Sequence, residues 1–326
     1  MIPYHGCQYS GQGGHYESWF LRANAPDAPR AFWIRYTLFI PADGKRAAMG
    51  ELWAIWFDGD RQQVTAVKEE YPLADCQFDD HTMSVQLAAA HLQSHALNGK
   101  AEHGGNRLSW TLNYDDGQAP VLFLPEALYP RKLPRAKSVV SRPMVRFTGR
   151  ISVNGEEHLI DGWSGSENHN WGSQHTDQYA WGQVAGFDNA PDAFLECITA
   201  RVRIGPVPSP WLTIACLRLD GKDYSFNRIG EALRARGKYR FFDWSFRTRS
   251  GGDTLNVHIE APAQHFTGLT YFNPPGGSKT CLNSKIARCT AELVSANGEH
   301  RTLTSAHGAA FEILTDRTDH GVPVAV

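Results

Sequence analysis

The class of fold is set by a ten-residue run, Ala31-Phe-Trp-Ile-Arg-Tyr-Thr-Leu-Phe-Ile40. It is rich in aromatic and β-branched residues, which favour the pleated surface of a sheet, and it stops at Pro41. Side chains of a strand alternate between its two faces, so Trp33 and Arg35 would share one face and Ile34 the other. The run therefore predicts a long β-strand.

Outward from this run the same pattern recurs along the chain, with tight-turn signals such as Asn154-Gly155 and Asp220-Gly221 between the strands. The further predicted strands are 51–57, 63–68, 107–114, 144–153, 158–160, 193–204, 211–219, 239–248, 255–261, 289–294 and 310–314. Helical periodicity favours only residues 84–97, where a strand at 83–87 is the alternative, and residues 229–236. The proline-rich residues 125–143 predict a surface loop. Many short strands joined by tight turns predict an all-β sandwich or barrel architecture.

Composition limits the functions that the chain can have. At 326 residues it is long for one ordinary domain, and we expect two, 1–172 and 173–326. A net charge of −2 argues against nucleic-acid and polybasic membrane binding. The chain has neither a signal-peptide pattern nor an apolar run near the ~20 residues of a membrane span, and its six cysteines are scattered. We therefore expect a cytoplasmic protein with buried free thiols; its oligomeric state stays open. The 10 Trp, 11 Tyr and 16 Phe suit a small apolar ligand as partner.

One segment, residues 161–188, differs from its surroundings because histidine, asparagine, tryptophan and carboxylates gather among glycines. Acid–base chemistry needs a carboxylic acid or a histidine beside the substrate. The catalytic candidates are Glu167, His169, Asp177 and Asp188. The spacing of His169 and His175 matches no standard metal site, so we predict no metal. The structural alternative is a glycine-rich turn whose polar side chains satisfy buried backbone groups.

The end of this segment alternates as a strand does, which predicts a pocket wall. Tyr179, Trp181, Gln183, Ala185 and Phe187 would lie on one face. The candidate substrate-binding residues are Asn168, Asn170, Trp171, His175, Tyr179, Trp181, Gln183 and Trp53. Trp53 and Trp56 would point to opposite faces of their strand, so only one of them can line a given cavity.

Two motifs carry a family resemblance, Asn168-His169-Asn170-Trp171-Gly172 and Tyr179-Ala180-Trp181-Gly182. With the stretches 16–23, 31–36, 50–55 and 273–277, they make the chain resemble the AttH and hydroxyneurosporene synthase (carotenoid 1,2-hydratase) group of lipocalin-like proteins, most closely the AttH branch. Tocopherol cyclase and the lipocalin-like fungal Diels–Alderases resemble it more distantly. The resemblance implies two calycin-like β-domains side by side, with the motifs near their junction. It also implies apolar polyene, prenyl or polyketide substrates and no redox cofactor or metal.

The chain departs from the carotenoid hydratases at the first motif. They carry Asp-His-Glu-Trp where this chain has Asn168-His169-Asn170-Trp171, and an amide cannot donate a proton as a carboxylic acid does. Carotenoid hydration itself is therefore disfavoured. If acid catalysis is retained, Glu167, Asp177, Asp188 or protonated His169 must supply the proton.

Three hypotheses follow for the function. The leading one is a cofactor-free enzyme that hydrates, isomerises or cyclises an isoprenoid-like or polyketide-like substrate. Protonation of an alkene would then need aromatic faces to stabilise the cation, and Trp171, Tyr179 and Trp181 could supply them. The second is a lipocalin-like carrier of an apolar molecule without chemistry. The third is a stress- or surface-associated protein whose second domain supports a partner contact.

Overall fold

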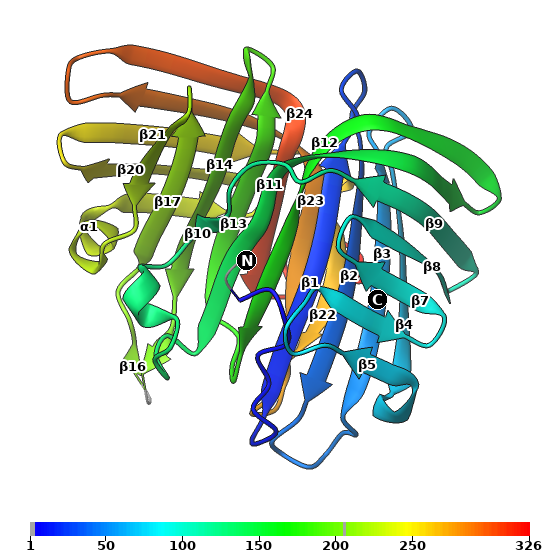
Figure 1. Cartoon of the computed structure of the whole chain (residues 1–326). Helices are drawn as coiled ribbons and strands as arrows, with labels where there is room; N and C mark the ends of the chain where they lie inside the picture. Colours follow the sequence, from blue (N-terminus) through cyan, green and yellow to red (C-terminus); the bar gives the residue numbers. More distant parts are fainter. Residues whose placement is uncertain (1–3, 205–206) are drawn as a thin grey trace.

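The computed structural model describes residues 4–204 and 207–326, and most of them form two large antiparallel sheets that lie side by side (Figure 1). The first sheet runs in the order β4 (Gln63–Pro72), β3 (Met49–Asp58), β2 (Arg30–Ile40), β1 (His15–Asn24), β12 (Glu156–Gly172), β11 (Ala136–Val153), β9 (Asn106–Tyr114), β8 (Ala96–His103), β7 (Ala90–Gln93), β6 (Ser84–Leu87) and β5 (Cys76–Phe78), with β10 (Val121–Leu122) beside β11. The strand β4 also contacts β8 and β9, so the sheet curls into a nearly closed barrel.

The second sheet contains the strands that follow β12, apart from one separate pair of short strands. Its order is β18 (Lys222–Phe226), β17 (Leu212–Leu219), β14 (Ala190–Arg201), β13 (Gln178–Phe187), β24 (His300–Thr315), β23 (Ser278–Val294), β21 (Asp253–Glu260), β20 (Asp243–Ser250) and β19 (Arg236–Arg240), with β22 (Thr267–Phe272) beside β23. The remaining elements are the small pair β15 (Arg203–Ile204) and β16 (Val207–Pro208), the helix α1 (Ile229–Arg234), and the 3₁₀ turns η1 (Leu73–Asp75), η2 (Glu126–Leu128) and η3 (Ala263–His265). No helix in the described residues has the length and apolar character needed to cross a membrane.

Both sheets follow one topology. In each, the first strand (β1 or β13) lies between the second strand (β2 or β14) and the last (β12 or β24) of its half. The penultimate long strand (β11 or β23) follows, and a short extra strand, β10 or β22, pairs with it. The chain passes between the two sheets only once, through residues 173–177.

The predicted all-β class is confirmed, and so is the short helix in 229–236. The helix at 84–97 is wrong, because the chain there forms β6, β7 and the start of β8. Ala88 and His95 have φ values of +50° and +72°, which belong to tight turns and not to a helix. The predicted loop at 125–143 is too long, since β11 begins at Ala136.

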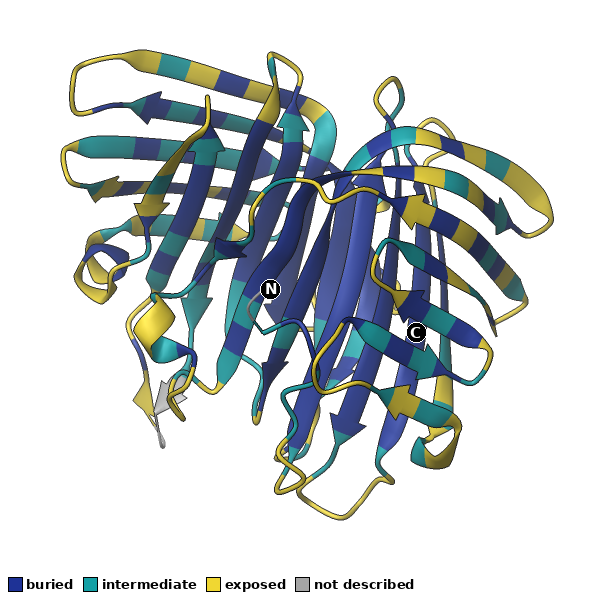
Figure 2. Ribbon diagram, viewed as in Figure 1, coloured by how far each residue is buried: buried dark blue, intermediate teal, exposed yellow. Residues whose placement is uncertain are grey.

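Apolar clusters fill each curled sheet, and a third cluster lies between the sheets. We call this contact the junction. The first sheet contributes Phe20, Trp33 and Trp53 to it, and the second contributes Trp181 and Tyr271. The central strands that meet there are buried almost throughout, whereas the outer strands alternate between buried and exposed residues (Figure 2).

Candidate functional site

The first half of the 161–188 segment is the end of the long strand β12, not a glycine-rich loop or turn as predicted. Its glycines allow neighbouring strands to approach. A Cβ on Gly165 would lie 1.9 Å from the carbonyl oxygen of Arg22, and one on Gly172 equally close to that of Arg135. Gly162 adopts a φ of +66°, which L-residues rarely do. The segment therefore joins the two sheets as strand, linker and strand.

The two faces of β12 separate the predicted residues into two groups. Glu167, His169 and Trp171 face side chains of the first sheet, among them Tyr114 and Trp19. Asn168 faces the second sheet and bonds to a side chain of β13. The predicted site is therefore two clusters on opposite sides of one strand.

Glu167 belongs to a fully satisfied ionic group in the first sheet. Its carboxylate accepts from Arg142 Nη1 at 2.6 Å, from the Tyr114 hydroxyl at 2.7 Å, and lies 2.8 Å from Nε2 of His5. Burial would raise the pKa of Glu167, but these contacts outweigh it and lower that pKa below the ordinary value. A carboxylate held in this ionised state is a poor proton donor at neutral pH.

Glu17 organises the adjacent group around His169. One carboxylate oxygen lies 2.7 Å from Nε2 of His169 and the other 2.8 Å from Nε2 of His15, while the backbone N–H of Gln8 donates to both. The His169 ring is stacked on Trp19, with ring centroids 4.8 Å apart. Burial alone would raise the pKa of Glu17, but the two histidines reverse this and lower it to about 2. The group fastens the N-terminal residues to β1 and β12.

Low pH should therefore reduce the stability of the fold, because it protonates Glu17. A carboxylate whose pKa falls from 4.5 to about 2 on folding contributes about 3 kcal/mol above pH 4.5, and loses it as pH falls towards 2. We expect the free energy of unfolding in urea to drop over this range, and Glu17→Gln to flatten the drop. Equal pH slopes for the variant and the wild type would contradict the assignment.

On the junction face, an amide links the two sheets. Gln183 donates from Nε2 to Asn168 Oδ1 at 2.8 Å. Its Oε1 accepts from Arg22 Nε at 2.8 Å and from the Ser166 hydroxyl at 2.6 Å. All four side chains are buried. Asn168 and Gln183, both predicted to bind substrate, are thus brought together from β12 and β13.

A carboxyl group outside the 161–188 segment completes this arrangement. Glu196 of β14 accepts from Trp181 Nε1 at 3.1 Å and from Gln183 Nε2 at 3.3 Å, and is 1% exposed. Desolvation dominates over these two bonds and over the more distant Arg22, and raises the pKa of Glu196 to about 7. Glu196 is therefore a buried acid that carries a proton in a large fraction of molecules at neutral pH.

A second carboxyl group in the junction is paired. Glu312 of β24 lies 2.7 Å from Lys285 Nζ and accepts from Asn283 Nδ2 at 3.0 Å. The hydroxyl of Tyr179, another predicted binding residue, donates to it at 3.4 Å. Unlike Glu196, this carboxylate has a cationic partner, so the two acids of the junction differ in environment.

The other predicted residues are dispersed. His175 is stacked on Tyr16 at 3.7 Å, and desolvation lowers its pKa to about 3. Asp177 pairs with Lys279 at 3.5 Å, and Asp188 is exposed, where it accepts the Ala306 amide.

Trp53 and Trp56 take opposite faces as predicted, and Trp53 lies in the junction. Asn170 has a buried Oδ1 that makes no hydrogen bond to the described protein atoms. Phe187 does not share the face of Trp181, because a bulge at Gly186 turns it into the core of the second sheet.

One group of three potential metal ligands exists within residues 4–204 and 207–326. Asp243, His258 and Glu260 lie on the neighbouring strands β20 and β21, half-buried. His169 and His175 are not part of it and have separate partners, Glu17 and Tyr16.

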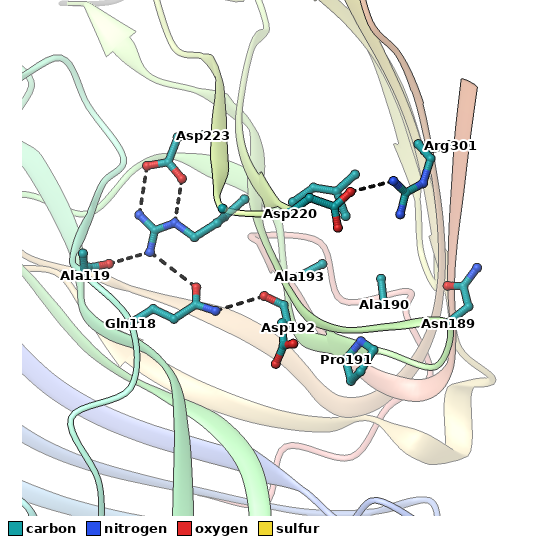
Figure 3. A pocket seen from close by; sticks show the side chains of 13 residues that line it. Gln118, Ala119, Asn189, Ala190, Pro191, Asp192, Ala193, Asp220, Asp223 and Arg301 are labelled. Atoms are coloured by element: carbon teal, nitrogen blue, oxygen red, sulfur yellow. Dashed lines mark hydrogen bonds and ion pairs between the residues drawn. The ribbon is translucent and has the colours of Figure 1, made fainter. Parts of the chain in front are cut away.

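Two grooves lie outside the junction. The first, of about 880 Å³, is bounded by Gln118 and Ala119 of the first half and by the turns after β13 and β17 (Figure 3). Arg218 binds Asp223 through two bonds of 2.6 and 2.9 Å there and donates to Ala119 O. The second groove, of about 790 Å³, lies beside β8 and β9. Gln118 donates to the carbonyl oxygen of Asp192, and with the Arg218–Ala119 bond this links the two halves at the first groove (Figure 3).

The fold is similar to two solved structures over nearly its whole length. One is a protein with the provisional name AttH from Nitrosomonas europaea, with 14% identity and a TM-score of 0.59 over 97% of this chain and 98% of that one. The other is kievitone hydratase from Nectria haematococca, with 11% identity and a TM-score of 0.58 over 97% and 94%. The sequence matches no family model and no curated protein. At such identities the likeness shows the fold, and it confirms the predicted pair of lipocalin-like β-domains.

Proposed function

We propose that the chain is an enzyme that needs no cofactor and protonates an alkene of an apolar isoprenoid-like or polyketide-like substrate in the junction, leading to hydration, isomerisation or cyclisation. The observation that carries the proposal is Glu196, a buried carboxyl with a pKa of about 7. General acids work best when their pKa lies near the operating pH. Glu196 meets this condition, whereas Glu167 does not, because its contacts keep it ionised.

The surroundings of Glu196 suit a developing cation. Trp181, which donates to Glu196, has its ring centroid 5.6 Å from the Lys285 ammonium, so this ring already accommodates a positive charge. Phe194 and Met144 belong to an apolar cluster on the same side. Aromatic and apolar side chains would exclude water from the intermediate until it is captured.

Further parts of the proposal rest on the resemblance in sequence. We also propose that the chain belongs to the AttH-like branch, that its domains are 1–172 and 173–326, and that it is cytoplasmic. The kievitone hydratase likeness supports a hydratase among the three reactions. The single crossing of the chain at 173–177 supports the domain limits.

A carrier protein is the second candidate, favoured by the aromatic and apolar side chains that meet between the sheets. Both candidates require an apolar ligand in the junction. They differ in proton transfer, which a carrier does not perform.

Ligand binding tests the common requirement. We expect a fluorescent retinoid to quench the tryptophans of the wild type, and Trp181→Ala to weaken its binding at least tenfold, since deleting a buried aromatic contact costs several kcal/mol. Trp211→Ala is the control, because Trp211 is 36% exposed and packs against Tyr239. Trp181→Phe provides a milder variant that keeps most of the volume. Identical titrations for all proteins would refute binding at the junction.

A further inference from the structure

The junction contains a buried arginine without an acidic partner. Arg35 of β2 is 6% exposed, and its guanidinium carbon lies 4.5 Å from the ring centroid of Tyr271 and 5.9 Å from those of Trp33 and Trp53. Its Nη2 donates to the Ser18 hydroxyl at 2.6 Å. We call these five residues the arginine cage. No carboxylate of the described chain lies within 4 Å of Arg35.

The nearby acids are already neutralised by other cations. Glu51 pairs with Lys68 at 2.8 Å, and Glu312 pairs with Lys285 at 2.7 Å. Arg142 is as little exposed as Arg35 but, unlike Arg35, has an acidic partner, Glu167, at 2.6 Å. Tyr271, Glu51 and Glu312 together raise the pKa of Arg35 in spite of its burial, but neither carboxylate contacts the guanidinium, which leaves that position open to an anion.

Three N–H donors of the cage make no hydrogen bond to the described protein atoms. They are Nε of Arg35 and the indole nitrogens of Trp33 and Trp53, all fully buried. Arg35 and Trp53 are direct cross-strand partners on β2 and β3, and Trp33 lies two residues before Arg35 on the same face. Buried donors rarely go unsatisfied, and three in side chains beside one guanidinium suit a ligand that carries acceptor oxygens.

We propose that the arginine cage binds the anionic oxygen group of the ligand, a carboxylate or an ionised enol or phenol. The ligand of the junction would then be amphipathic, with an acidic head at Arg35 and an apolar body. This inference rests on the proposed function and specifies its substrate class. A carboxylate matches the cage because it both neutralises the guanidinium and accepts several N–H bonds.

The register of the strands connects the cage to the acid. Arg35 is paired with Phe20, whose ring packs edge-on against Trp181 at 6.1 Å. On β1, Ser18 bonds to Arg35 in the cage, and Arg22 bonds to Gln183, whose side-chain amide also bonds to Glu196. Ser18 and Arg22 are four residues apart, which is about 13 Å along a strand. An apolar body lying over Phe20 would thus bring a double bond to Glu196 when its head is at Arg35.

A matched pair of probes tests the inference. We expect the wild type to bind retinoate about 10- to 100-fold more tightly than retinol, because the two share their apolar body and differ in the anionic head. In Arg35→Met the preference should disappear, with retinol affinity retained. Arg301→Met is the control, since Arg301 pairs with Asp220 in the groove of Figure 3, outside the junction.

The outcomes separate this inference from the proposed function. Equal affinities for the two probes in the wild type, or a preference that persists in Arg35→Met, would overturn the arginine cage and leave the junction site intact. Absence of binding by both probes would contradict both proposals. Arg35→Met should still fold without ligand, because no carboxylate in residues 4–204 and 207–326 is in contact with Arg35 and none loses an ion-pair partner. If it does not fold, Arg35→Lys keeps the charge but loses the Nε donor, and should show a reduced preference.

Discussion

Glu196→Gln is expected to slow proton transfer to a bound alkene by about 10²–10⁴-fold, the usual contribution of a general acid. Glutamine keeps the size of glutamate and can still accept from Trp181 Nε1; of the hydrogen bonds it loses only the one of 3.3 Å from Gln183 Nε2, so the junction should stay folded. It also lacks the ionisable proton. The measurement is deuterium incorporation into farnesoate, or a prenylated phenol, incubated with the protein in D₂O and followed by mass spectrometry.

The pH profile gives an independent check on Glu196. Since only the protonated carboxyl can donate, the wild-type rate should decline as pH rises through about 7. Glu292→Gln is the matched control, because Glu292 is half-buried on β23 beside Asn256 and away from Trp181. Incorporation at wild-type rate in Glu196→Gln would remove this acid from the mechanism. If wild-type protein binds the probe but never incorporates deuterium, the carrier function is favoured.

Arg142→Met should lower the free energy of unfolding by about 3–5 kcal/mol, because it leaves the carboxylate of Glu167 buried without its cation. The same substitution at Arg35 should cost much less, although both arginines are 6% exposed, because no carboxylate in the part of the chain that the structure describes is in contact with Arg35. The pair of variants therefore isolates the effect of an acidic partner at equal burial. Urea unfolding at pH 7 measures it.

A double variant tests the cause of the loss. Glu167→Gln combined with Arg142→Met removes both charges, so it should recover a large part of the stability that Arg142→Met loses. A cost below about 1 kcal/mol for Arg142→Met would mean that His5 and Tyr114 suffice for Glu167.

The strands of the fold could be read from the sequence because their signals are local. Residues 31–40 alternate, contain β-branched and aromatic side chains, and end at a proline, and they form β2 with one added residue. The failure at 84–97 has a local cause too. Alanines at 88 to 90 favour a helix, but Ala88 is the corner of a two-residue turn between β6 and β7, which only pairing with neighbouring strands determines.

The site could be predicted only in part, since its geometry depends on pairing between distant strands. Trp181 and Gln183 were identified by their alternation within one segment. Glu196 was not, because it comes opposite Gln183 only through the register of β13 with β14. Arg35 looked like an ordinary polar residue of a strand. Nothing in the sequence shows that its face is covered by β22, where Tyr271 lies.

The shared topology of the two sheets bears on the origin of the junction. The first strand of each half contacts the penultimate long strand of the other, β1 with β23 and β13 with β11, as the two subunits of an isologous dimer present one patch to each other. Duplication and fusion of such a subunit would give this arrangement, with residues 173–177 as the fused connection. In an ancestral pair every polar group would occur twice. Here Arg22 of β1 lies on one side of the contact and the acid Glu196 of β14 on the other, so loss of symmetry would have left two chemically different sides. Such a polarised contact can hold one elongated molecule in a single direction, which two identical faces cannot do.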